Sequence, residues 1–220
     1  MTDHLATVVT LPTRMTADLA GRAVRTVGLW ADDVDDWGRD EGIVNRVWWA
    51  SRLRWDINVG GAANLLVRGG GLIAVNSRRY ALAPVFAALA IGEAIQRPVR
   101  FVGRSDVAPF GPALQRLGGL LPIADEVEGA LRAGELVVLG AAHESSNRRC
   151  GRFDHRLIGA AVAAQVPVFP GATTSSPTGR GARVEVGTPV RLARRRRGPL
   201  AEVELARGAR RRVDKVLEAL

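Results

Sequence analysis

The sequence predicts a single α/β domain, with a largely parallel or mixed sheet flanked by helices. Two observations lead to this prediction. From Leu72 onward, short apolar runs alternate with segments of helical character, which is typical of sheets whose strands are joined by helices. In addition, 47% of the 220 residues are hydrophobic, which is enough for one sizeable core. We expect residues 1–40 to form an N-terminal extension and residues 41–220 to form the α/β domain.

The first elements lie between residues 31 and 61. The acidic stretch 31–40 is expected to be a solvated turn region. Residues 41–55 have apolar side chains at helical spacing, including Ile43, Val47, Trp48 and Leu53, which predicts an N-terminal helix packed on the domain. Residues 54–61 alternate between apolar and polar side chains, which predicts a half-buried strand.

The remaining elements follow from the alternation of apolar runs and helical patterns. Buried strands are predicted at 72–75, 99–103, 135–140 and 166–170. Helices are predicted near 84–96, 111–118, 125–133 and 153–165. A late strand at 182–190 precedes a C-terminal helix at 199–220, with Pro199 suited to its first turn.

Cysteine content and hydropathy suggest a cytoplasmic protein, at most peripheral to the inner face of a membrane. Cys150 is the single cysteine, so no internal disulfide can form and a reducing compartment is expected. The N-terminus lacks the basic and apolar regions of a signal peptide. The longest apolar stretch, 80–95, is shorter than the roughly 20 residues of a spanning helix, which favours a core helix there.

The formal net charge of +9 favours anionic partners. Two arginine-rich runs, "RLARRRRG" at 191–198 and "ARGARRR" at 206–212, are either solvated faces or contacts to an anionic membrane surface. Nucleic acid is disfavoured because no nucleic-acid-binding motif occurs and aromatic residues do not interleave with the basic runs. A protein partner or a homo-oligomer stays open.

The stretch "LIAVNSRRYALAP", 72–84, predicts a strand, a loop beginning at Asn76, and a helix. Such junctions in α/β sheets usually hold functional groups. This junction has no histidine, carboxylate or cysteine. Arg78 and Arg79 could bind a phosphate at the helix N-terminus, or could be solvated. The same alternatives apply to Arg104, Arg148 and Arg149.

Several segments in the same order resemble the glycerophospholipid acyltransferase superfamily, of the lysophosphatidic acid type. "GGGLIAVN" resembles the strand before the family's His-x4-Asp motif, and "RPVRFVGRSDVAPFGPALQRLGG" its second block. "ALRAGELVVL" is similar to the helix and strand before its Glu-Gly-Thr motif, and "AAQVPVFPGA" retains its Val-Pro-x-x-Pro block. The resemblance covers roughly residues 40–220. It implies the glycerol-3-phosphate acyltransferase fold, no cofactor or metal, and acyl-CoA or acyl carrier protein as a possible ligand.

The departures from this family fall on its chemistry. The positions of the catalytic histidine and aspartate correspond to Ser77 and Leu82, and the substrate-binding glutamate corresponds to Ala142. In the family, the histidine is thought to act as general base on the acceptor hydroxyl. A serine hydroxyl is not a base near neutral pH, and general-base catalysis supplies about 10²–10⁴-fold in rate. The resemblance therefore implies a catalytically degenerate member, a pseudoenzyme that binds lipid, acyl carrier or a protein partner, with Asn76 and the five arginines above as candidate binding residues.

The alternative is an active acyltransferase with a displaced base. His143 could then act as the base, with Glu144 orienting it, and transfer an acyl chain to a hydroxyl acceptor such as a lysophospholipid. His143, Cys150 and His155 match no common zinc spacing, so no metal site is expected. A serine-hydrolase triad is also disfavoured, because no Gly-x-Ser-x-Gly elbow accompanies the "HESS" segment.

Overall fold

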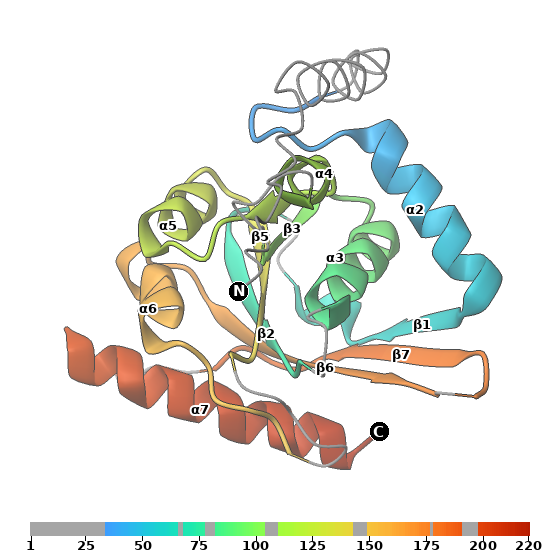
Figure 1. The fold of residues 1–220 in the computed structure, drawn as a ribbon. Helices are drawn as coiled ribbons and strands as arrows, with labels where there is room; N and C mark the ends of the chain where they lie inside the picture. Colours follow the sequence, from blue (N-terminus) through green and yellow to red (C-terminus); the bar gives the residue numbers. More distant parts are fainter. Residues whose placement is uncertain are drawn as a thin grey trace, which may run out of the picture.

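The computed structural model describes residues 34–65, 68–77, 82–103, 110–142, 149–176, 178–190 and 198–220. Within them, seven strands form one sheet with helices on both faces, which confirms the predicted α/β class (Figure 1). The strands are β1 (Asp56–Gly60), β2 (Gly71–Val75), β3 (Val99–Val102), β4 (Gly119–Leu120), β5 (Leu136–Gly140), β6 (Val168–Ser175) and β7 (Gly181–Val186).

The sheet is largely parallel, as predicted. Its strand order is β1-β7-β6-β2-β5-β3-β4. The β6–β7 pair is antiparallel, whereas the other neighbouring pairs are parallel. The antiparallel hairpin reverses the direction of β7 and β1 relative to the five other strands. The carboxyl ends of β2, β5 and β6 therefore meet at one edge of the sheet.

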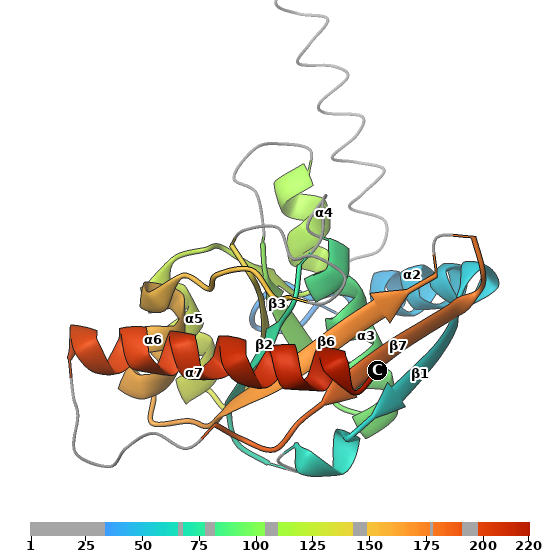
Figure 2. The ribbon, with the colours of Figure 1, turned by 90° about the horizontal axis from the view of Figure 1, so that it is seen from below.

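Six α-helices are described, together with a short 3₁₀ turn, η2 (Ala62–Asn64). The helices are α2 (Glu41–Arg54), α3 (Leu82–Ile95), α4 (Phe110–Arg116), α5 (Ala124–Arg132), α6 (His155–Ala163) and α7 (Pro199–Glu218). Helices α5, α6 and α7 cover one face of the sheet, and α2 and α3 cover the other (Figure 1). Figure 2 shows α7 lying across β6 and β2.

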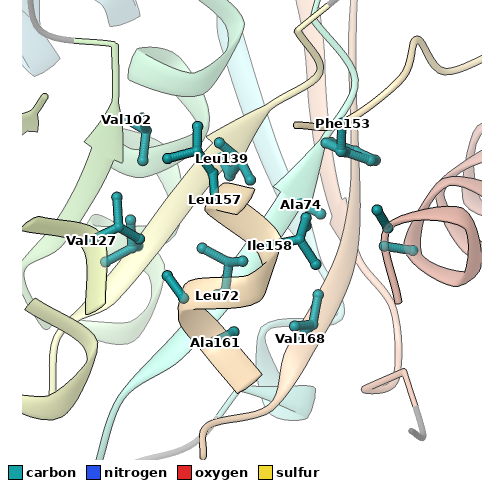
Figure 3. Packing of buried hydrophobic residues seen from close by; sticks show 14 of the residues in the cluster. Leu72, Ala74, Val102, Val127, Leu139, Phe153, Leu157, Ile158, Ala161 and Val168 are labelled. Carbon is teal, nitrogen blue, oxygen red and sulfur yellow. The ribbon is translucent and has the colours of Figure 1, made fainter. Parts of the chain in front are cut away.

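Strand β2 lies at the centre of two hydrophobic cores. All five of its residues are buried, because β5 and β6 flank it on both sides. Leu72 and Ala74 point to the face where Leu157 and Ile158 of α6 pack (Figure 3). Ile73 and Val75 point to the opposite face, which the apolar helix α3 covers. A strand buried on both faces explains why its sequence shows a continuous apolar run rather than alternation.

The prediction of a solvated acidic turn holds for residues 34–36, which are exposed, but is wrong for Arg39 and Asp40, which are buried. Trp37 packs against the core cluster on the α5–α7 face, and Asp40 is only 3% exposed. Asp40 caps α2, because its carboxylate accepts a hydrogen bond from the Ile43 N–H at 3.0 Å. The domain boundary expected after residue 40 stays a prediction, but the described part of the preceding segment packs on the domain.

Arg100 holds this segment to the sheet. It lies in the middle of β3 and is only 1% exposed. Its guanidinium donates to Asp35 at 2.7 Å, and its Nε lies 3.2 Å from Glu135. Burial alone would raise the pKa of Asp35. Hydrogen bonds from Arg100 and from two backbone N–H groups, together with the Arg100 charge, outweigh burial and lower that pKa below its ordinary value of 3.8.

The buried face of α2 differs in part from the apolar pattern. Val44 and Ser51 are its buried residues, and Ser51 is satisfied by donating its hydroxyl to the Val47 carbonyl. Trp48 packs against the core, as its place in the apolar pattern predicted. Leu53, expected on the buried face, is instead 59% exposed, because the core-facing stripe at this end of the helix passes through Ser51.

Candidate functional site

The candidate site is the junction between β2 and α3, at the carboxyl end of the central strand. Asn76 and Ser77 follow β2 directly, and α3 begins at Leu82. The predicted strand and helix are therefore confirmed, and residues 78–81 between them lie outside the described residues. Parallel sheets bind ligands at this edge because loops diverge there to opposite faces.

Asn76 joins the end of β2 to β6. Its side-chain carbonyl accepts hydrogen bonds from the Thr173 N–H at 2.6 Å and from the Thr173 hydroxyl at 3.2 Å. Its amide nitrogen donates to the Thr173 carbonyl at 2.9 Å. The side chain thus continues the β2–β6 ladder beyond its last backbone pair, Val75 with Gly171. The role in substrate binding that we expected for Asn76 stays a prediction.

Ser77 lies where β5 and α3 approach each other. It is 8% exposed. A Cβ atom added at Gly140, the last residue of β5, would lie 3.5 Å from the Ser77 Cβ and 2.6 Å from Pro84 Cγ. Gly140 therefore has to lack a side chain, since a larger residue would push α3 away from the strand ends. The space around Ser77 on this side is closely packed.

An apolar pocket opens beside the junction. It has a volume of about 230 Å³ and is formed by the start of α3, the end of β6, and β7 with β1. Its lining residues are Trp55, Ile57, Leu82, Ala83, Phe86, Thr173, Thr174, Ser175, Ala182, Arg183 and Val184. We call it the acyl pocket, after the ligand that is proposed for it below. Leu82, which the resemblance was expected to align with the family's aspartate, is 53% exposed and lines this pocket.

Two aromatic rings form one wall of the acyl pocket. The Trp55 and Phe86 rings meet edge to face, with their centroids 4.9 Å apart. Trp55 is placed by the end of α2, where its backbone N–H donates to the Ser51 carbonyl. Arg54 ties the same end of α2 to the β6–β7 turn by donating to the Gly179 carbonyl at 2.8 Å. The wall is therefore fixed by contacts between distant parts of the chain.

Among the described residues, the lining of the acyl pocket contains no histidine, cysteine or carboxylate. Arg183, the charged residue of this described lining, forms an ion pair with Glu185 at 3.1 Å. Within the described ranges, no group of three or more His, Cys, Asp or Glu residues could hold a metal ion. As described, the pocket can hold an apolar chain, but its lining offers no general base.

The structure describes only part of the predicted site. Asn76, Ser77, Leu82 and Arg149 are placed, and Arg149 is exposed and does not line the acyl pocket. The other candidates lie outside the described residues: Arg78, Arg79, Arg104, His143, Glu144 and Arg148. The proposed base His143 and its orienter Glu144 therefore stay predictions.

Sequence reasoning missed Thr173 and Phe86. Phe86 belongs to a continuous apolar helix, and Thr173 follows a predicted strand, so neither had a local pattern that marked it. Trp55 and Ile57 had a partial signal, because both were expected on the inner face of a half-buried strand. Only the contact of β6 and β7 with α3 brings these residues together.

Comparison with solved structures identifies the fold. The chain is similar to the 1-acyl-sn-glycerophosphate (LPA) acyltransferase PlsC from Thermotoga maritima, with a TM-score of 0.54 over 92% of this chain and 90% of that one. The two chains share a fold. Their sequences are 15% identical, so the likeness concerns the architecture. No protein-family model matches the sequence, and no curated protein does.

None of the helices in the described ranges is both long and apolar enough to cross a bilayer.

Proposed function

We propose that this chain is a member of the glycerophospholipid acyltransferase superfamily that binds an acyl chain in the acyl pocket without transferring it. One observation carries the proposal: an apolar pocket opens beside the β2–α3 junction, where Ser77 and Leu82 occupy the positions of the family's base and its orienter. The fold shared with an LPA acyltransferase supports the comparison of positions.

The acyl pocket has the chemistry of a hydrocarbon site. Aromatic and aliphatic side chains form most of its described lining, and the charge of Arg183 within that lining is neutralised by Glu185. Each methylene group moved from water into such a site contributes about 0.8 kcal/mol. Burial of several methylenes would therefore compensate for the conformational entropy that the acyl chain loses on binding. A free fatty acid, acyl-CoA and an acylated acyl carrier protein would all present such a segment.

The absence of transfer follows from the side chains at the junction. Ser77 cannot take a proton from an acceptor hydroxyl at neutral pH, and Leu82 cannot orient an imidazole. The alternative function, an acyltransferase using His143 with Glu144, rests on residues outside the described part of the chain. A transfer assay with acyl-CoA and lysophosphatidic acid separates the two. We expect no product above background, whereas turnover that is lost in His143→Ala would establish the displaced base.

Binding is tested by titrating the protein with a fluorescent polyene fatty acid. Ala83 lines the acyl pocket, so Ala83→Trp should fill it and weaken binding roughly tenfold or more. Ala94 lies on the same helix, is exposed and does not line the pocket, which makes Ala94→Trp the matched control. Equal affinities for the two variants would reject the acyl pocket as the binding site.

We also propose that an anionic membrane surface is the partner. The net charge of +9 and the arginine run at 206–212, which lies on α7, support this proposal. Each basic residue near an anionic surface contributes about 1 kcal/mol. Association of this kind is reversible, and it would bring the acyl pocket to a source of lipid. It also fits a protein at the inner face of a membrane.

A further inference from the structure

A second cavity lies on the opposite face of the sheet from the acyl pocket. It has a volume of about 420 Å³ and lies between α7 and the segment that leads into α6. Phe153 and Ala206, which belong to the core cluster on the α5–α7 face, are the buried part of its lining. Its full lining is Arg152, Phe153, His155, Val203, Ala206, Arg207 and Arg210.

The walls of this cavity are held together by hydrogen bonds. The Cys150 N–H donates to the Asp214 carboxylate at 2.6 Å, and the Cys150 carbonyl accepts from the Arg210 Nε at 3.0 Å. Two residues of α7 thus hold the backbone of residue 150. The Arg152 carbonyl accepts from the Ala142 N–H at 2.8 Å, which fixes the same segment next to the end of β5. The cavity is therefore formed before any ligand arrives.

The charge of the lining is of one sign. Some arginines elsewhere on the surface pair with carboxylates, as Arg132 does with Glu128 at 2.5 Å and Arg183 does with Glu185 at 3.1 Å. Among the described residues, the lining of this cavity has three arginines and a histidine but no carboxylate. Two nearby acids are engaged elsewhere: Asp214 holds residue 150, and Asp154 caps α6 by accepting from the Arg156 N–H.

We propose that this cavity binds a phosphate ester, through Arg152, Arg207 and Arg210. Guanidinium groups bind phosphate oxygens through paired N–H donors, and several of them around one hollow suit a doubly charged monoester. The volume of about 420 Å³ leaves room for an organic group beside the phosphate. This site is separate from the acyl pocket, and it shares Arg207 and Arg210 with the arginine run at 206–212. The same phosphate chemistry is found in a free glycerol phosphate, a nucleotide and a lipid headgroup.

The test measures binding of four probes by calorimetry or co-sedimentation: inorganic phosphate, sn-glycerol 3-phosphate, adenosine 3′,5′-bisphosphate, and phosphatidylcholine vesicles with or without phosphatidic acid. The test variant is Arg152→Gln combined with Arg207→Gln. Both residues are exposed, so folding should be unaffected, which circular dichroism and a melting curve check. The control is Arg211→Gln combined with Arg156→Gln, which removes the same charge from α7 and α6 outside the cavity.

We expect at least one phosphate ester to bind the wild type, and the test variant to bind it at least tenfold more weakly than the control variant. The probe that binds best identifies the source of the phosphate. Two results would overturn the proposal. One is the absence of binding of every probe at millimolar concentration. The other is an equal loss in the test and control variants, which would show that the net charge of the surface, rather than the cavity, attracts the anion.

Discussion

Replacing Asn76 with alanine should separate the end of β2 from β6. Asn76 is 1% exposed, and its side chain makes three hydrogen bonds to Thr173. Asn76→Ala would leave the Thr173 N–H and carbonyl without these partners. An unsatisfied buried donor or acceptor costs about 1–3 kcal/mol, and Thr173 is half-buried, so some of this cost would be recovered through water. We therefore expect a loss of about 2–4 kcal/mol in the free energy of unfolding.

This loss is large against the roughly 5–15 kcal/mol that stabilise a typical domain. For a chain of this size, it corresponds to a decrease in Tm of about 5–15 °C. Urea denaturation gives the free energy, and calorimetry gives the Tm. Because Thr173 lines the acyl pocket, fatty-acid binding should weaken in the same variant.

Asn58→Ala is the matched control for this experiment. Asn58 lies on the edge strand β1 and is exposed, so its replacement should change stability by less than about 0.5 kcal/mol. If Asn76→Ala unfolds at the same urea concentration as Asn58→Ala, the Asn76 side chain does not join the two strands. The geometry of the site derived from it would then be wrong.

Three further predictions follow from the described residues. Leu82→Asp should cost little stability because Leu82 is 53% exposed, whereas Ser77→His should lower the Tm because Ser77 is closely packed. If the double variant restores neither transfer nor the stability lost in the single variants, positions 77 and 82 do not face each other. Asp35→Asn should be destabilising at neutral pH, because the charged form of a carboxyl with a lowered folded-state pKa stabilises the fold above the unfolded-state pKa. This stabilisation is lost as the pH falls through the folded-state pKa, so the difference from the wild type in urea titrations should disappear at acid pH; a pH-independent difference would refute the ion pair with Arg100. Binding to anionic vesicles should weaken with salt, since screening acts over roughly 8 Å at physiological ionic strength, and equal binding to neutral vesicles would argue against a charged contact.

The central elements of the fold could be predicted because their signals are local. Strand β2 is a continuous apolar run that ends at a polar asparagine, and α3 is an apolar helix too short to span a membrane. The alternation of strands and helices then indicated a largely parallel sheet. The two-residue strand β4 was missed because a periodicity cannot appear in so short a segment.

The docking of residues 34–40 could not be predicted from their composition. Asp35 looks solvated in the sequence, and its partner Arg100 lies 65 residues away. One indirect signal existed: an arginine within an otherwise apolar strand needs a carboxylate partner if it is buried. The acyl pocket was hidden for a similar reason, since its walls come from four elements that meet only in the folded chain.

The most direct test of acyl binding is to map where a fatty acid lies on the protein. A fatty acid with a diazirine on its chain is bound, irradiated and located by peptide mass spectrometry. The account predicts labels in the peptides that carry Trp55, Phe86 and Val184, and loss of these labels in Ala83→Trp but not in Ala94→Trp. Labelling confined to other parts of the chain, or unchanged by Ala83→Trp, would contradict it.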